Sequence, residues 1–314
     1  MLARDRAVYG KEGSTVKMKR TRGDVIFDAI NVLIMFLFAM IVIYPLYLVL
    51  ISSVSDPRAV VRGDVLFYPI DISFEGYKRL LMNKMILIGY RNTIVYTVFG
   101  TTFAVMLTML AGYGLSRNFP GKKFFSLFVI FTMFFKGGMI PDFLLVRSIG
   151  LYDNPLSIII LNSMTIVNVF MARTVIRSTL PDELFDAASI DGCGHFAYFV
   201  RMVLPLSKAL LGVLAVLYGV NAWNDYATGM IYIRNTNLQV FQVLLKDIIT
   251  SVSTSATMAE MMSENDRIDL QFAMRLAESV KYAAIVISLA PMIVIYLSAQ
   301  NFFTKGIMMG SMKG

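Results

Sequence analysis

A cluster of amide, carboxylate and aromatic side chains interrupts a long apolar stretch at VNAWNDY, residues 220–226. Side-chain amides can hydrogen-bond the hydroxyls of a sugar, and an aromatic ring can pack against the C–H face of the same sugar. Polar side chains within apolar segments are costly and usually face a cavity or one another. The same residue types also suit the aromatic belt at a membrane surface, so both interpretations stay open. With one amide from an earlier stretch, the candidates for a polar path are Asn162, Asn221, Trp223, Asn224, Asp225 and Tyr226.

The chain has little of the chemistry that an enzyme would need. It holds one cysteine and one histidine, Cys193 and His195, which excludes an internal disulfide, a Cys-rich zinc site and an iron–sulfur cluster. We therefore expect no catalytic residue, no bound metal and no cofactor in this chain. The stretch SRNFPGKK contains Gly121-Lys122, but Ser116 stands where a P-loop needs glycine and Lys123 where it needs Ser or Thr. Any ATP is then hydrolysed by another chain.

The composition indicates a membrane protein. Of 314 residues, 57% are hydrophobic and 16% are charged, and the mean hydropathy is +0.65; soluble domains carry about 25% charged residues. A helix that crosses the hydrocarbon core needs about 20 mainly apolar residues. Six segments are candidates, so we predict an all-α integral membrane protein with six transmembrane helices. They are residues 25–52, 93–115, 124–135 (which must continue through 136–146), 155–172, 205–233 and 279–303.

Charge predicts the orientation. The net charge of +8 can suggest nucleic acid, but the Lys and Arg residues fall mostly between apolar segments, where they act as topology signals, and we expect no nucleic-acid partner. Residues 1–23 hold seven Lys or Arg against two acids, which favours a cytoplasmic N-terminus. An even number of spans returns the C-terminus to the same side. Residues 116–123, 173–208 and 304–314 then face the cytoplasm.

The cytoplasmic stretch between the fourth and fifth spans is predicted to form a helix–turn–helix. STLPDELFDAAS can begin a helix, with Ser178 or Thr179 as cap, Pro181 in the first turn and two acids near the positive helix end. GCG, residues 192–194, breaks this helix, and HFAYFVRMV resumes helical apolar spacing.

This loop resembles the hallmark loop of the permease subunits of ATP-driven (ABC) importers. The family pattern is E-A-A, three residues, G, nine residues, I, one residue, L-P. The chain has Asp186-Ala187-Ala188, Gly192, Met202 and Leu204-Pro205 with both spacings intact. RNTIVYT, AGYGLSR, GGMIPDFLLVRSIGL and the C-terminal KG also look like the carbohydrate permeases. Residues 25–314 resemble the second, maltose-G-type subunit, and within it the LplC/YtcP-like complex-polysaccharide branch of Gram-positive bacteria.

The resemblance implies a type I ABC importer permease fold in the bacterial cytoplasmic membrane. A cytoplasmic coupling helix would sit in a groove of the ATPase, with Leu184, Phe185 and Ala188 as its docking ridge. The implied partners are a second homologous permease subunit, an ATPase dimer that holds ATP and Mg, an extracellular sugar-binding lipoprotein, the oligosaccharide and the lipid bilayer. The implied coupling residues are Glu183, Leu184, Phe185, Asp186, Ala187, Ala188, Asp191, Gly192 and Pro205. The ATPase-contacting tail would be Met312, Lys313 and Gly314.

We expect the chain to divide at its spans. Residues 1–24 form the basic tail, 25–90 the first transmembrane helix and an extracellular loop, 91–304 the permease core, and 305–314 the cytoplasmic C-terminal tail. The core includes the coupling loop 178–205 and an extracellular loop 234–278.

One alternative function is that of a permease subunit of an ABC importer for another solute. A secondary transporter is less favoured, because the halves show no repeat and no acid lies near mid-span. An intramembrane enzyme is disfavoured because no Ser/His or Asp/Asp arrangement lies within the apolar spans.

Overall fold

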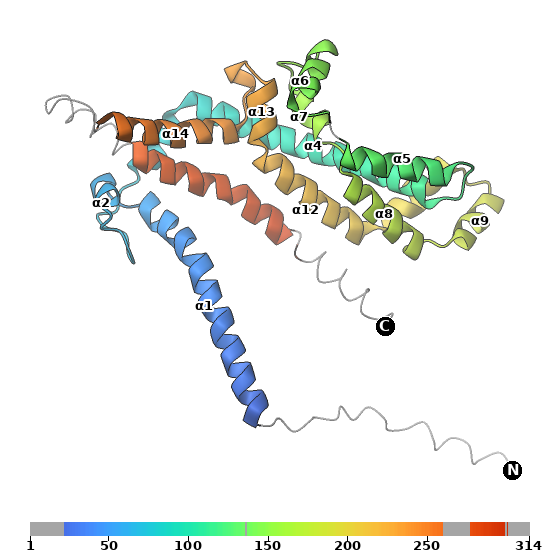
Figure 1. The fold of residues 1–314 in the computed structure, drawn as a ribbon, viewed down its shortest axis with the longest axis horizontal. Helices are drawn as coiled ribbons and strands as arrows, with labels where there is room; N and C mark the ends of the chain where they lie inside the picture. Colours follow the sequence, from blue (N-terminus) through green and yellow to red (C-terminus); the bar gives the residue numbers. More distant parts are fainter. Residues whose placement is uncertain (1–21, 136, 260–276, 299, 301–314) are drawn as a thin grey trace. The chain divides into compact units, whose positions relative to one another are not determined.

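The computed structural model describes residues 22–135, 137–259, 277–298 and 300, and these residues are helical or lie in connecting turns (Figure 1). The first helix, α1 (Arg22–Ser53), runs through Pro45. By its contacts the chain separates into two units, residues up to Leu48 and residues from Val49 onward. This boundary falls inside the first helix. Within the first unit the apolar side chains of α1 are exposed, as expected of a helix in contact with lipid.

The second unit is built from helices of very different length. The two short helices α2 (Pro57–Arg62) and α3 (Glu75–Met82) precede α4 (Lys84–Ser116), which is the longest helix in this unit. Then follow α5 (Lys122–Phe134), α6 (Met139–Ser148), α7 (Leu156–Leu161), α8 (Ile166–Thr179), α9 (Asp182–Ile190), α10 (His195–Tyr198), the π-helical turn η1 (Phe199–Val203) and α11 (Leu204–Leu206). The remaining elements are α12 (Lys208–Asn224), α13 (Tyr226–Tyr232), the 3₁₀ turn η2 (Thr236–Leu238), α14 (Phe241–Ala259) and a helix at Ala277–Ser298.

Helix α4 is the centre of the second unit, and its most extensive neighbours are α8 and α12. Gly112 allows the close approach of α8, because a Cβ atom there would lie 2.7 Å from Ala172 Cβ. Small residues at such crossings bring helices together where lipid removes the hydrophobic driving force. Met109 and Leu214 are fully buried in the core cluster that α4, α8 and α12 share with η1.

The start of α4 is tied to the segment that follows α13. Asn92 Nδ2 donates to the carbonyl oxygens of Asn237 (2.8 Å) and Gln239 (3.2 Å). Thr93 Oγ1 accepts from the backbone N–H of Phe241 at 2.8 Å. These side chains belong to RNTIVYT. This stretch therefore has a structural role, because it hydrogen-bonds backbone groups of the chain reversal at residues 237–241.

The long apolar helices agree with the sequence analysis at three positions. Among the described residues, α1, α4 and the helix at 277–298 are long and apolar enough to cross a membrane, and up to five spans result if each bent pair counts as one. The third segment is divided into α5 and α6, whose axes differ by 114°. The fourth segment is broken between α7 and α8, and the fifth is broken at Asp225.

The expected extracellular loop 234–278 contains a long helix. Helix α14 takes up FQVLLKDIIT and continues to Ala259. Residues 260–276 lie outside the described residues.

The close crossing at Gly112 gives a test of the packing. Gly112→Ala is expected to lower the stability by about 1–3 kcal/mol, because the added methyl collides with Ala172 across a filled interface. Gly114→Ala is the matched control, since nothing lies within 4 Å of its Cβ position; it should be neutral or stabilising by up to about 1 kcal/mol. Thermal unfolding in detergent measures both variants. Equal effects of the two substitutions would contradict the crossing.

Candidate functional site

A cavity of about 770 Å³ lies between α5, the break that separates α7 from α8, and the end of α12. Its lining mixes amides, hydroxyls and one carboxylate with apolar groups. Such a mixture binds a ligand that has both polar and apolar faces. The lining residues are Thr132, Met133, Leu161, Asn162, Met164, Thr165, Ile166, Val167, Tyr218, Asn221, Asn224 and Asp225.

The breaks that open this cavity are held by side chains. Tyr218 Oη accepts from the Thr165 backbone N–H at 3.0 Å and shares a 2.7 Å hydrogen bond with Thr108 Oγ1 of α4. Asp225 caps α13, because its Oδ1 accepts from the Thr228 backbone N–H at 3.1 Å. Asn162 then joins the two breaks, since its Nδ2 donates both to Asp225 Oδ2 and to Thr228 Oγ1.

The structure brings four of the six predicted path residues together. Asn162, Asn221, Asn224 and Asp225 line the cavity. Three of these make hydrogen bonds within the protein, including Asn224, whose Nδ2 donates to the Val220 carbonyl. Asn221 is exposed and makes no hydrogen bond within the described part of the chain.

Trp223, also predicted for the path, does not line this cavity. It is only 1% exposed, its Nε1–H donates to the Ser288 carbonyl at 3.0 Å, and its ring meets the edge of the Tyr90 ring at 5.6 Å. Trp223 therefore joins α12 to α4 and to the helix at 277–298. Tyr226 is also absent from the lining, and its ring lies 4.9 Å from Lys246 Nζ.

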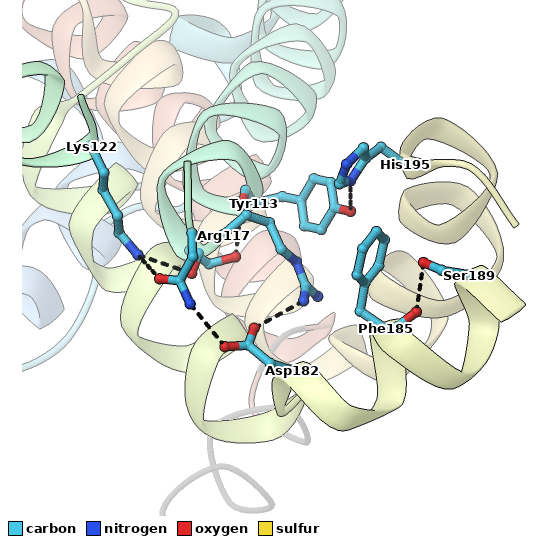
Figure 2. A network of polar contacts seen from close by, with 9 residues as sticks. Tyr113, Arg117, Lys122, Asp182, Phe185, Ser189 and His195 are labelled. Atoms are coloured by element: carbon cyan, nitrogen blue, oxygen red, sulfur yellow. Dashed lines mark hydrogen bonds and ion pairs between the residues drawn. The ribbon is translucent and has the colours of Figure 1, made fainter. Parts of the chain in front are cut away.

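A second polar network lies where α4 ends and the loop around α9 begins (Figure 2). Arg117 follows the last residue of α4, and its side chain is only 10% exposed. The guanidinium carbon lies 4.8 Å from the Phe185 ring centre, 5.1 Å from that of Tyr198 and 5.2 Å from that of Tyr113. Arg117 Nη1 pairs with Asp182 Oδ1 at 3.3 Å. Attraction to the rings and the carboxylate offsets the cost of removing this charge from water.

The same network fixes the turn after α9. Tyr113 Oη and His195 Nδ1 are hydrogen-bonded at 3.1 Å, and the His195 ring stacks on Phe185 with centres 4.7 Å apart (Figure 2). Gly192 makes the turn with φ +78°, a conformation that favours glycine. The helix–turn–helix predicted from the sequence is thus present, from Asp182 through η1.

One local expectation about this loop is wrong. Ser178 and Thr179 form the last turn of α8 and do not cap α9, which begins after Pro181 without a side-chain cap. Leu184, Phe185 and Ala188, the expected docking ridge, are partly buried against the core of this chain.

The outward face of the loop carries other residues. Glu183, Asp186, Ala187, Asp191 and Gly192 are exposed. Two apolar side chains accompany them, Ile190 at 87% exposed and Phe196 at 75%. Pro205 lies in α11, beyond the π-helical turn. The predicted tail residues Met312, Lys313 and Gly314 fall outside the described residues.

Sequence reasoning missed two groups that hold these sites. Tyr218 was not singled out, because a tyrosine within an apolar stretch resembles any core residue. Arg117 was read only as part of AGYGLSR. A charge directly at the end of a long apolar segment, followed 65 residues later by an acid at the start of a helix, was the available signal.

Two proteins of known sequence and one solved structure are similar to this chain. The polygalacturonan/rhamnogalacturonan transport system permease protein YtcP of Bacillus subtilis (strain 168) is 31% identical over 291 residues, which cover 92% of this chain and 99% of YtcP. Protein LplC of the same organism is 30% identical over 298 residues, 95% of this chain and 98% of LplC. The crystal structure of a bacterial ABC transporter involved in the import of the acidic polysaccharide alginate includes a similar chain. Its TM-score is 0.81 at 31% identity, with 91% of this chain and 99% of that chain covered. No protein-family model matches.

Among the described residues, three helices are long and apolar enough to cross a membrane, which indicates an integral membrane protein. The identity to YtcP over nearly its full length then gives the family: the chain belongs to the permease subunits of ABC transporters. Its role is that of a permease subunit and not of an enzyme.

The burial of Trp223 predicts a structural phenotype. Trp223→Phe is expected to lower the stability by about 1 kcal/mol or more, because the bond to the Ser288 carbonyl and part of the buried ring are lost. The KM for uptake should stay unchanged, since the ring lies outside the cavity. Tyr226→Phe is the control, as Tyr226 is 43% exposed. A large rise in the KM of Trp223→Phe without a loss of stability would instead indicate that Trp223 contacts the substrate.

Proposed function

We propose that the chain forms half of the translocation path of an ATP-driven importer of oligosaccharides that arise from polysaccharide breakdown. The observation that carries this proposal is the cavity of about 770 Å³, whose amides, hydroxyls and carboxylate offer hydrogen bonds to sugar hydroxyls. The names of its relatives support the substrate class. Besides YtcP and the alginate transporter, a 27% identical relative from Bacillus subtilis is the melibiose/raffinose/stachyose import permease protein MelC.

The proposed topology has six spans. In this view α1, α4 and the helix at 277–298 each span alone, and the pairs α5–α6, α7–α8 and α11–α12 span as broken helices. Irregular backbone at membrane depth is tolerated where it lines a cavity, which is the position of the break between α7 and α8.

The proposed orientation places both termini and the α9 loop in the cytoplasm. The end of α4, the start of α5 and the end of α8 lie at one end of the second unit, and this end carries Arg117, Lys122, Lys123, Arg173 and Arg177. An excess of Lys and Arg in short loops marks the cytoplasmic side. Residues 1–21 extend the same bias in sequence.

We assign α9 as the coupling helix, with the ATPase dimer as the partner on its outward face. The exposed acids of α9 and the apolar side chains of Ile190 and Phe196 offer that partner both charge and apolar area. Because Arg117 ties Phe185 and Asp182 to the end of α4, a displacement of α9 would be carried to α4. Helices α8 and α12 pack on α4 and line the cavity, which gives the displacement a route to the path.

The further partners are a second, homologous permease subunit that completes the path and an extracellular sugar-binding lipoprotein. Recovery of both subunits and the ATPase with the tagged chain, after mild-detergent purification from its native membrane and mass spectrometry, is the experiment that tests this assembly. A chain recovered alone or as a homodimer would favour a secondary transporter instead.

The proposed docking of the ATPase on the outward face of α9 is tested by introducing a charged side chain there. Ile190→Asp is expected to weaken association with the ATPase by about tenfold or more, because it places a charge in an apolar contact. The chain should still fold, since Ile190 is 87% exposed. Ile72→Asp is the matched control, because Ile72 is 69% exposed and lies in the segment before α4, at the opposite end from α9. Co-purification of the ATPase at graded salt measures the effect, and an unchanged Ile190→Asp complex would reject this docking face.

The cavity is tested at Asn221, whose amide makes no hydrogen bond to the described residues. Asn221→Leu is expected to raise the KM for oligosaccharide uptake by about three- to tenfold through loss of a hydrogen bond, with little change in stability. Asn237→Leu, in the exposed η2 turn outside the cavity lining, is the control. Radiolabelled uptake in vesicles with a fixed amount of binding protein gives the KM. Equal KM values for Asn221→Leu and wild type would place the sugar elsewhere.

A further inference from the structure

A basic groove of about 430 Å³ lies between the start of α5 and the end of α8, outside the cavity of the proposed path. Lys122 and Lys123 line it from α5, and Arg173 and Arg177 line it from α8. A second hollow of about 390 Å³ shares both arginines. Four cations therefore line the groove, and two of them, Arg173 and Arg177, also line the second hollow.

No acid among the described residues forms an ion pair with these cations. Asp182 is the carboxylate that acts on Lys122, but its oxygens are taken by Arg117 Nη1 at 3.3 Å and by Asn118 Nδ2 at 3.2 Å. Like charges kept together without acids leave a site of positive potential, which attracts an anion.

The position of Lys122 shows that the cluster is held in place. Lys122 Nζ donates to the Ser116 carbonyl at 3.2 Å and to Asn118 Oδ1 at 3.3 Å (Figure 2). Opposite it, the Arg173 guanidinium lies 5.5 Å from the Phe170 ring centre. An arginine pair with planar donor groups is suited to the oxygens of a phosphate.

The far wall of the groove is apolar. Leu127, 67% exposed, and Ile130, 37% exposed, complete the lining one and two turns beyond the lysines. No residue of α5 is buried, and Phe124 and Phe128 are 68% and 57% exposed. A helix with this exposed face is covered by lipid, so the groove opens from a charged end onto an acyl-chain environment.

We propose that this groove binds an anionic phospholipid, with the headgroup phosphate between Lys122, Arg173 and Arg177 and an acyl chain along Leu127 and Ile130. Basic pockets between helices on the cytoplasmic side have the chemistry for such headgroups. A bound lipid would neutralise the cluster at the base of α5 and α8, next to the Arg117–Asp182 pair that holds α9. The site thereby links the lipid composition to the loop proposed for coupling.

The test is native mass spectrometry of the full-length chain, purified with the subunits that accompany it, delipidated and then titrated with cardiolipin or with phosphatidylcholine. The wild type is expected to retain cardiolipin over phosphatidylcholine. Arg173→Gln/Arg177→Gln should weaken cardiolipin retention by about tenfold or more, whereas Arg173→Lys/Arg177→Lys should recover part of it. Arg147→Gln/Arg234→Gln removes two exposed arginines elsewhere and should leave retention unchanged.

Two further measurements separate a lipid from a soluble phosphate. Leu127→Asn is expected to weaken cardiolipin binding while leaving the affinity for inorganic pyrophosphate unchanged, because only the lipid contacts the apolar wall. Full displacement by pyrophosphate with no effect of Leu127→Asn would overturn the lipid assignment in favour of a soluble anion. Equal losses in the two double glutamine variants would show non-specific attraction and overturn the site. A monodisperse size-exclusion profile of each variant confirms that a loss of binding is not a loss of fold.

Discussion

The burial of one positive charge, that of Arg117, determines where the α9 loop lies against the helices. A guanidinium that is removed from water needs compensation, and here three ring faces and the Asp182 carboxylate provide it. Its Nε and Nη2 atoms are buried without a hydrogen-bond partner among the described residues, so the rings are its main surroundings. Because Phe185 and Asp182 come from α9 and Tyr113 from α4, the charge is stabilised only while these two elements stay together.

Helix α4 can carry this junction because it is packed along much of its length. In lipid, helices associate through close van der Waals contact and hydrogen bonds, since apolar surface gains nothing by leaving lipid. Gly112 against Ala172 supplies the close contact with α8. Thr108 bonded to Tyr218 supplies a buried hydrogen bond to α12 at 2.7 Å. The junction at Arg117 and the cavity lined by Tyr218 are thus connected through a single helix.

The sequence predicted those helices and turns that depend on short stretches of the chain. The apolar lengths of α4 and of the helix at 277–298, and the turn at Gly192, follow from composition and from glycine at a positive φ. The breaks at residues 162–165 and at Asp225 could not be predicted in this way, because an apolar window averages over them. The burial of Trp223 and the partial burial of Phe185 could not be predicted for a related reason: whether a side chain faces outward or its own core depends on helix rotation, which tertiary packing sets.

The breaks also explain why a polar cavity can exist among apolar helices. Each break frees backbone groups that lipid cannot satisfy, so side chains must do so: Tyr218 for Thr165, and Asp225 for α13. The side chains that hydrogen-bond the backbone groups at the breaks also line the cavity. Most polar groups of the cavity are therefore used to stabilise the fold. The exposed Asn221 amide is not used in this way within the described residues. In the proposed path, recognition of a polar solute would therefore depend on groups that the breaks do not use, such as Asn221, and the fold-supporting groups would set the shape around them.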